Sequence, residues 1–309
     1  MRIIVHGQQA FGKAVLEALL ERGEEIVAAY CAPEKEGQRI DPLKEAAQAR
    51  GLPVFQPKSF RKQEVWEEFA ALKPDLCVMA YVTLFVPEEV LNLPTHGTIQ
   101  YHPSLLPRHR GPSSINWPII WGETRTGLTI FWPDNGLDTG PVLLQQEVPI
   151  KPDDTLGSLY FDSLFPMGVA AMLEGVDLVK AGTAPKVVQD EAQATYEGWC
   201  KKENVEIDWS KSADEVYNLI RGANPQPGAW TTVGGKTVQI FESRKVSGGG
   251  TPGSGAPGTV TAVSGDTITV AAQGGAIEVQ RVRPEGAGKV AAAEFAGSAG
   301  LKVGSKLGA

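Results

Sequence analysis

The stretch MRIIVHGQQAFGKAVLEALLERGEEIVAAY, residues 1–30, decides the fold because it holds one complete repeat of the pattern that the chain continues. Short apolar runs at 3–6 and 25–30 flank a segment whose apolar residues have helical spacing. The residues at that spacing are Phe11, Val15, Leu16, Leu19 and Leu20. The pattern predicts a strand, a helix and a second strand, and such a unit places its two strands parallel in one sheet.

The same alternation continues to about residue 181. It predicts helices at 41–50 and 63–72, a long helix from about 154 to 181, and further strands at 53–55, 75–80, 97–101, 127–132 and 142–148. Strands that alternate with helices are typical of a sheet covered on both faces. We therefore predict an α/β fold with a Rossmann-like, mostly parallel sheet.

The character of the sequence changes from about residue 206. After a short helix near 213–221, the chain offers strand-like segments separated by turn residues, at 236–242, 258–264, 266–272 and 276–281. They predict a small β-barrel or sandwich, and we choose a β-barrel of OB-like type. The tract SGGGTPGSGAPG, 247–258, has a linker composition, but a linker there would leave the earlier strands without partners, so we interpret it as a long mobile loop inside this domain. The predicted domains are a catalytic domain at 1–205 and a β-barrel-like domain at 206–309.

Composition excludes several classes of function. The 309 residues carry a formal net charge of -7, so the chain lacks the general positive field that gathers nucleic acids. The three cysteines are far apart and predict neither a disulfide framework nor a zinc site. Gly7 and Gly12 have P-loop spacing, but Ala14 stands where that loop needs a hydroxyl residue, so phosphate binding is not supported. We see neither a secretory leader nor a stretch near the about 20 apolar residues of a membrane helix, and expect a cytoplasmic protein.

One of the four histidines stands at a position where a ligand would bind. His102 directly follows the predicted strand GTIQY, and in an open α/β sheet ligands bind outside the carboxyl ends of the strands. Pro103 and Pro107 restrict the backbone that follows. His6 is expected to pack against the sheet, and His96 to lie half exposed in a turn. His102 is therefore the histidine that we single out for proton transfer.

The segment PDNGLDTG, 133–140, supplies a possible partner for His102. Asp134 is typical of a turn residue that accepts backbone hydrogen bonds, whereas Asp138 is less easily explained in that way. If the two neighbouring strands end side by side, Asp138 would lie beside His102. A carboxylate and an imidazole in contact form the pair that general acid and base catalysis employs.

These residues resemble a known family. HPSLLPRHRG at 102–111, followed 36 residues after His102 by Asp138 in GLDTG, is similar to the signature of formyltransferases that use 10-formyltetrahydrofolate. The segment 194–230 and the end of the chain resemble the family's carboxy-terminal domain, so the resemblance spans nearly the whole chain. DPL at 41–43, INW at 115–117 and TIFW at 129–132 look most like the amino-terminal hydrolase domain of 10-formyltetrahydrofolate dehydrogenase. Methionyl-tRNA formyltransferase is also similar.

The resemblance implies where the folate would bind. It places the pterin among backbone groups of the strand end and loop that contain Met79, Tyr81, Leu84, Phe85, Pro133, Asp134, Gly136 and Leu137. For Leu84 and Phe85 a plain core position is an equal alternative. Arg108 and Arg110 either bind the glutamate tail of the folate or tie their own loop together, and Ser104 is expected to cap the turn. The resemblance implies no metal.

Gln100 departs from the transferases of the family, which carry asparagine two residues before the histidine. The resemblance implies that the asparagine donates a hydrogen bond to the formyl oxygen, and glutamine displaces that amide by one methylene. Three functions remain open: hydrolysis of 10-formyltetrahydrofolate, formyl transfer to an amine of methionyl-tRNA or an amino sugar nucleotide, and folate binding without turnover. Binding of tRNA is not favoured by the charge, and the oligomeric state and any partner subunit stay undetermined.

The hypothesis assigns three side chains to hydrolysis. His102, with Gln100 as a possible second donor, stabilises the tetrahedral oxyanion. Asp138 accepts a proton from the attacking water and returns it to the leaving nitrogen. A carboxylate does this near neutral pH only if burial raises its pKa from about 3.9, so we expect Asp138 to be poorly solvated.

Overall fold

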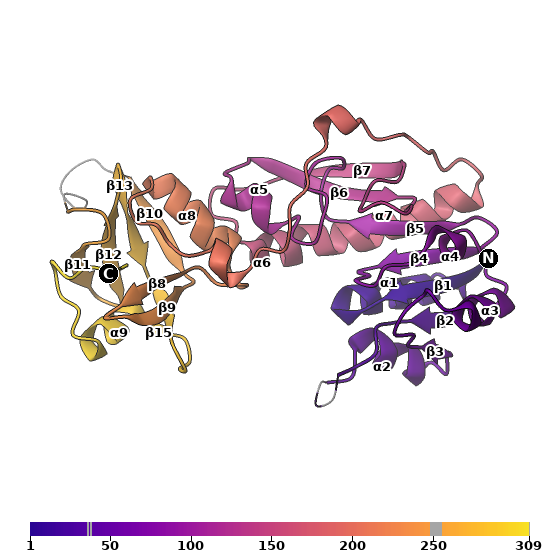
Figure 1. Ribbon diagram of the computed structural model, residues 1–309, viewed down its shortest axis with the longest axis horizontal. Coiled ribbons are helices and arrows are strands. Elements are labelled where there is room, and N and C mark those ends of the chain that lie inside the picture. Colours follow the sequence, from indigo (N-terminus) through magenta and orange to yellow (C-terminus); the bar gives the residue numbers. More distant parts are fainter. Residues whose placement is uncertain (36, 38, 248–254, 309) are drawn as a thin grey trace. The chain divides into compact units, whose positions relative to one another are not determined.

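The seven strands expected in the first part of the chain form one sheet in the computed structural model, which describes residues 1–35, 37, 39–247 and 255–308. The strand order is β3-β2-β1-β4-β5-β6-β7 (Figure 1). The first five strands pair in parallel, and β6 runs antiparallel to β5. The bounds are β1 (Arg2–Gly7), β2 (Glu25–Tyr30), β3 (Val54–Phe55), β4 (Leu76–Ala80), β5 (Thr98–His102), β6 (Arg125–Phe131) and β7 (Val142–Pro149). The predicted mostly parallel sheet is confirmed.

Contacts divide the chain into two units, each built from separate segments. Unit 1 comprises Met1–Gly111, Gly127–Val148 and Asp162–Tyr196, and unit 2 comprises Pro112–Thr126, Pro149–Phe161 and Glu197–Ala309. The chain therefore passes from one unit to the other more than once. The boundary between predicted domains 1–205 and 206–309 stays a prediction.

Helices cover both faces of the sheet in unit 1. On one face, α1 (Gln9–Glu21) packs against α2 (Pro42–Ala49) and α7 (Phe165–Lys180), and α7 also contacts β5. On the other face, α3 (Gln63–Ala71) and α4 (Glu88–Leu91) bury apolar side chains against β1 and β4. After β1 the chain forms β2 and β3 on one side of β1, and β4 then pairs with β1 on the opposite side. The carboxyl ends of β1 and β4 therefore border the crevice typical of ligand sites in such sheets.

Two glycines allow backbone elements to approach closely. A Cβ at Gly7 would lie 2.1 Å from the carbonyl oxygen of Ala80, so β1 and β4 can pair only if residue 7 has no side chain. This packing requirement explains Gly7 without a phosphate site. On α7, a Cβ at Gly168 would lie 2.6 Å from the ring of Tyr101, and the helix can therefore lie close to β5.

The long helical run that contains α7 corrects one expectation. Among the described residues, Leu156–Lys180 is long and apolar enough to cross a membrane by length and composition. The prediction that no stretch approaches the length of a membrane helix is therefore wrong. The apolar side chains of α7 include Met172 and Val176, which are buried in unit 1. Since core helices of globular proteins pass the same test, the run is weak evidence for a membrane span.

Unit 2 contains two four-stranded sheets, β10-β13-β12-β11 and β15-β14-β9-β8, around one apolar core. Their strands are β8 (Trp230–Val233), β9 (Lys236–Ile240), β10 (Ser243–Ser247), β11 (Val260–Ser264), β12 (Thr267–Ala272), β13 (Gly275–Val279), β14 (Arg281–Pro284) and β15 (Val290–Ala291). The helices are α5 (Asn116–Ile120), α6 (Leu156–Leu159), α8 (Ala213–Gly222) and α9 (Ala292–Ser298). Only Gln280 separates β13 from β14, so one bent strand joins the two sheets. This agrees with the predicted β-barrel-like domain.

The Gly- and Ser-rich tract at 247–258 lies within unit 2. Residues 248–254 of the tract are outside the described residues. The strands before it pair with strands after it, because β9 pairs with β14 and β10 with β13. The tract therefore lies inside one domain and does not link two, which confirms that prediction. Its predicted mobility concerns residues 248–254, which are outside the described residues.

His6 gives unit 1 a pH-dependent stability. Its ring is 3 % exposed and lies 5.0 Å from that of Phe60 and 6.2 Å from that of Tyr30, between centroids. Burial lowers the pKa of His6 from 6.5 to about 3. Between these values the unfolded chain binds a proton that the folded protein does not, so the free energy of unfolding falls as the pH falls.

We expect His6 to contribute a loss of about 2 kcal/mol between pH 7 and pH 5. The measurement is urea unfolding of the wild type and of His6→Gln at both pH values. The variant should be less stable at pH 7 but should lose about 2 kcal/mol less on acidification. Equal losses in the two proteins would mean that His6 is not the source of the dependence.

Candidate active site

His102 ends β5 and its orientation is fixed by a backbone carbonyl. The imidazole is 5 % exposed, and its Nε2 lies 2.8 Å from the carbonyl oxygen of His109. Since a carbonyl only accepts hydrogen bonds, Nε2 carries a proton and donates it. Ser104, fully buried, donates to the carbonyl of Arg108 at 2.7 Å and so closes the turn, as predicted. The other ring nitrogen, Nδ1, is left to face the site.

The structure brings His102 and Asp138 together. Nδ1 of His102 lies 3.6 Å from Oδ2 of Asp138, and the two side chains are 7 % and 10 % exposed. The backbone N–H of Gly111 donates to the same Oδ2 at 2.9 Å. The predicted contact and the predicted poor solvation of Asp138 are both confirmed.

The route by which Asp138 reaches His102 differs from the prediction. We expected two strand ends to lie side by side, but β6 runs antiparallel to β5, with His102 opposite Thr129 and Gln100 opposite Phe131. The carboxyl end of β6 therefore lies toward the amino end of β5. It is the loop 133–140 that carries Asp138 to the histidine.

Backbone strain gathers around the site. Among the described residues, five non-glycine residues have positive φ, and four of them follow β1, β4, β5 or β6. These are Gln9, Tyr81, His109 and Asp138, with φ of 60, 64, 55 and 56°. Such conformations persist only where surrounding contacts hold them, and they cluster at functional sites.

Hydrogen bonds within the loop 133–140, and from it to α4, fix its shape. Asp134 accepts from the backbone N–H of Gly136 at 3.0 Å and from the hydroxyl of Thr139 at 2.6 Å, so the predicted turn role is confirmed. Asn135 exchanges two hydrogen bonds with Glu88 at the start of α4. Leu137 is 57 % exposed, and Pro133 is half-buried.

Gln100 shares the face of β5 that carries His102, because side chains two residues apart in a strand point the same way. The residue is half-buried. Among the described residues, no hydrogen bond of its side-chain amide is found. The amide is therefore available to a ligand beside the imidazole.

The segment after β4 supplies apolar side chains to the same end of the sheet. Tyr81 and Phe85 are 47 % and 53 % exposed, so Phe85 is not the core residue that we held open as an alternative. Leu84 is half-buried and packs on the core beneath α3. Met79 lies within that core and is 4 % exposed, so its side chain is not available to a ligand.

Arg108 and Arg110 differ sharply in their surroundings. Arg108 is exposed, whereas Arg110 has no exposed surface. Arg110 donates to both carboxylate oxygens of Glu191, at 2.6 and 2.9 Å, and also to Tyr196. These hydrogen bonds raise the pKa of Arg110 and lower that of Glu191. Of the two roles left open for Arg110, the structure supports a structural one, because the side chain holds its loop to residues 189–196.

The residues that hold Arg110 form the strap segment, which we define as residues 187–196. Sequence reasoning missed its members Gln189, Glu191 and Tyr196. The only signal was indirect: a rigid loop with a buried cation needs a partner, but the partner lies 79 or more residues away.

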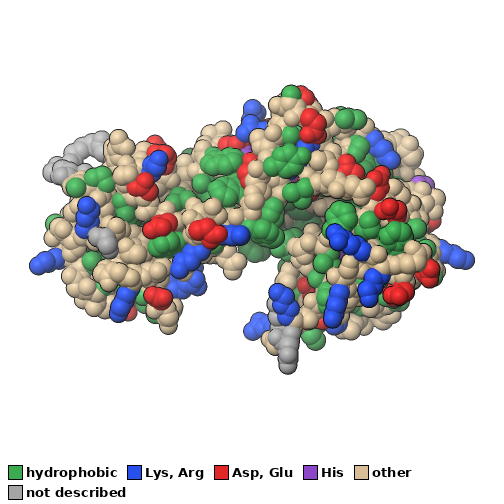
Figure 2. Space-filling model, in the orientation of Figure 1, with side chains coloured by type: hydrophobic (Ala, Val, Ile, Leu, Met, Phe, Trp, Pro, Cys, Tyr) green, Lys and Arg blue, Asp and Glu red, His purple; other side chains and the backbone are tan. Residues whose placement is uncertain are grey.

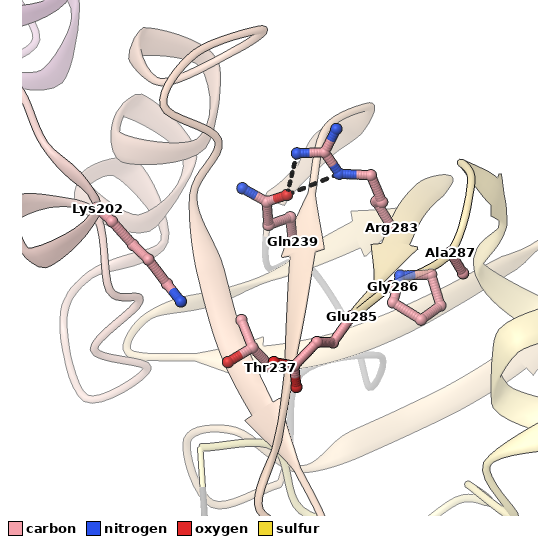
Figure 3. A pocket seen from close by; sticks show the side chains of 8 residues that line it. Lys202, Thr237, Gln239, Arg283, Glu285, Gly286 and Ala287 are labelled. Carbon is pink, nitrogen blue, oxygen red and sulfur yellow. Dashed lines mark hydrogen bonds between the residues drawn. The ribbon is translucent and has the colours of Figure 1, made fainter.

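Polar and charged side chains also line a pocket of unit 2. Among the described residues, no group of three or more His, Cys, Asp or Glu could hold a metal ion. A pocket of about 370 Å³ in unit 2 is lined by Lys202, Thr237, Gln239 and Arg283, and there Arg283 donates to Gln239 (Figure 3). On the face drawn in Figure 2, basic and acidic side chains lie interspersed.

Comparison with protein families gives two matches. The family model described as Formyl transferase matches residues 1–172, and the model described as Formyl transferase, C-terminal domain matches residues 200–300. The cytosolic 10-formyltetrahydrofolate dehydrogenase of Xenopus tropicalis is 44% identical over 82% of this chain. The chain spans only 28% of that relative. The methionyl-tRNA formyltransferase of Geotalea uraniireducens is 39% identical and is covered over 98% of its length.

Solved structures share the fold. HypX from Aquifex aeolicus, in complex with tetrahydrofolic acid, superposes with a TM-score of 0.71 at 21% identity, over 98% of this chain and 48% of that chain. The sugar 3N-formyl transferase WlaRD superposes with a TM-score of 0.69 at 16% identity, over 93% of this chain and 98% of that chain. At such identities the likeness concerns the fold alone.

Proposed function

Because the chain belongs to the formyl transferase family, we propose that it binds 10-formyltetrahydrofolate and passes the formyl carbon to water, releasing tetrahydrofolate and formate. The observation that carries the proposal is the buried contact between His102 and Asp138. Two further features favour water over an amine. Gln100 replaces the asparagine of the transferases, and several similar relatives are 10-formyltetrahydrofolate dehydrogenases.

In this proposal His102 stabilises the oxyanion through Nδ1. Nε2–H is donated to the carbonyl of His109, so in this role the ring is an imidazolium, which has a second N–H at Nδ1 to donate toward the oxyanion. The 3.6 Å contact with Asp138 is longer than a hydrogen bond, so Nδ1 is not committed to the carboxylate and can bind the same reacting group from beside it. The amide of Gln100, on the same face, supplies a second donor.

Asp138 acts as the base and then as the acid. Oδ2 receives the N–H of Gly111, so Oδ1 is the oxygen left for water. The carboxylate accepts a proton as the water oxygen bonds to the formyl carbon. When the bond from carbon to N10 breaks, the same proton passes to the nitrogen and tetrahydrofolate leaves. The formic acid that is released loses the second proton of the water to solvent and becomes formate.

The pterin would lie at the carboxyl ends of β1 and β4. Tyr81, Leu84, Phe85 and Leu137 offer side chains there, while Met79, Pro133, Asp134 and Gly136 offer backbone groups. Exposed apolar surface of this kind at a strand end suits a flat heterocycle. Arg108, exposed on the loop after His102, remains our choice for the glutamate tail.

Formyl transfer to an amine is the second candidate. It is favoured by the match to methionyl-tRNA formyltransferase, which covers 100% of this chain and 98% of that protein. The experiment is product analysis with 10-formyltetrahydrofolate alone, with methionyl initiator tRNA, and with an amino sugar nucleotide. Hydrolysis predicts formate without any acceptor. A formylated amine would contradict it, and tight binding with no product would indicate a binding module.

Gln100→Asn tests the choice of acceptor directly. Shortening the side chain by one methylene moves the donor back to the position that the transferases use. A shift of this size changes the reaction rate in a site that needs its donors within about 0.5 Å of the productive geometry. We expect acceptor-independent formate release to fall by about tenfold, since a misplaced donor weakens the oxyanion contact. Formate and acceptor formylation are measured together. Unchanged hydrolysis would remove Gln100 from the mechanism, and Gln146→Asn on β7 is the matched control.

A further inference from the structure

The conformation of Asp138 needs an external support. With φ of 56° it lies in the left-handed region, which a side chain with Cβ disfavours. Gly140 follows two residues later, and a Cβ there would lie 1.7 Å from the carbonyl oxygen of Trp132. The backbone at 138–140 is therefore tightly packed and strained, and it carries the proposed base.

Gln189 of the strap segment contacts this strained backbone. Its side chain is buried, with the residue 7 % exposed. Nε2 donates to the carbonyl of Asp138 at 2.9 Å and to the carbonyl of Gly140 at 2.7 Å. Both hydrogens of the amide are thus donated to carbonyls of the loop that carries Asp138.

Arg110 determines which way the amide of Gln189 points. Nε and Nη2 of Arg110 donate to Oε1 of Gln189 at 3.1 and 2.7 Å. A guanidinium only donates, so the amide oxygen must face Arg110 and the amide nitrogen must face the loop. The bidentate pair with Glu191 in turn fixes the guanidinium.

The loop after β5, which contains Arg110, also positions His102. The backbone N–H groups of His109 and Arg110 donate to the hydroxyl and the carbonyl of Thr195 in the strap segment, at 2.8 and 3.0 Å. The carbonyl of His109 then receives Nε2 of His102, and the N–H of Gly111 reaches Asp138. One continuous network therefore connects the strap segment with both members of the proposed pair.

We propose that Gln189 is a positioning residue that, oriented by Arg110, holds the backbone of Asp138 so that its carboxylate meets His102 and Gly111. The inference rests on the proposed function for its kinetic consequence. Its structural consequence, the position of Asp138, can be measured whether or not the protein hydrolyses the folate.

The test uses two variants of the full chain. Gln189→Met keeps the length of the side chain and removes all four hydrogen bonds. Gln189→Glu keeps the pairing with Arg110 but turns an oxygen toward two carbonyls. If Gln189 only fills space or accepts from Arg110, the Glu variant should keep its activity. If Gln189 holds Asp138 through its N–H groups, both variants should lose activity.

Gln56→Met is the matched control. Gln56 also accepts from a cation, Lys44 at 2.8 Å, and donates to a carbonyl, that of Ala32 at 2.9 Å. It follows β3, which three strands separate from β5. Its loss removes the same kinds of hydrogen bond without touching the network around Asp138.

We expect both Gln189 variants to lower kcat by about tenfold or more with KM within about twofold, because small misplacements of a reacting group reduce turnover. The independent readout is the amide of Gly111, followed by NMR hydrogen exchange, which should quicken at least about tenfold as its acceptor moves. Full kcat in Gln189→Glu, or unchanged Gly111 exchange in both variants, would overturn the proposal. If the wild type released no formate, Gly111 exchange alone would decide it.

Discussion

Asp138→Asn is expected to lower kcat for formate release by about 10² or more, because general acid and base catalysis contributes rate factors of this order. Asparagine keeps the size of the side chain and can still accept from Gly111 through its amide oxygen. It cannot take a proton from water. The change therefore removes the chemistry and retains the geometry.

The measurement is single-turnover formate release, with binding of 5-formyltetrahydrofolate as a parallel readout. Binding should stay within about threefold, because the proposed role of Asp138 concerns the transition state. Asp208→Asn in unit 2, an exposed carboxylate that accepts from Ser210, is the control and should behave as the wild type. Turnover near the wild-type rate in Asp138→Asn would remove this carboxylate from the mechanism.

The sequence predicted the contact between His102 and Asp138 but not the path of the chain between them. Strand periodicity identifies β6 correctly and does not reveal its direction relative to β5. That direction depends on how the chain between the two strands returns to the sheet. The residues converge because the turn centred on Asp134 folds the loop 133–140 back, and a local turn motif is readable from sequence.

Long-range polar partners could not be predicted in this way. Arg110 looks like either a ligand-binding or a loop-tying residue, and its partners Gln189 and Glu191 are 79 and 81 residues away. The strap segment has no regular periodicity, since it is mostly irregular backbone. Nothing in a single sequence pairs a particular glutamine with a particular arginine at that separation.

The strands of unit 2 show a different limit. β8 and β15 span four and two residues, too few for a period of two to be recognised. β13 and β14 are separated by Gln280 alone, with no turn residue between them. The sequence pattern therefore does not show where β13 ends and β14 begins. The fold class survives these errors because it depends on the number and type of the longer elements.

His102→Gln is the second large effect, and we expect kcat to fall by about 10² to 10³, the usual cost of removing an oxyanion donor. The glutamine amide can replace Nε2–H in the hydrogen bond to His109, so the loop keeps its support. The second N–H of the amide is on the same nitrogen, so no donor takes the place of Nδ1 beside Asp138. Comparison with Asp138→Asn separates the two roles, since residues that act together give a double variant much less impaired than the product of the single effects.

His96→Gln is the control for His102→Gln, because His96 is exposed in the turn before β5. Thermal unfolding of each variant shows whether lost activity reflects lost structure. If His102→Gln kept its melting temperature and also kept kcat, the imidazole would serve only to brace the His109 carbonyl. Hydrolysis would then have to depend on Asp138 and Gln100 without the imidazole, and the proposed role of His102 as an oxyanion donor would be wrong.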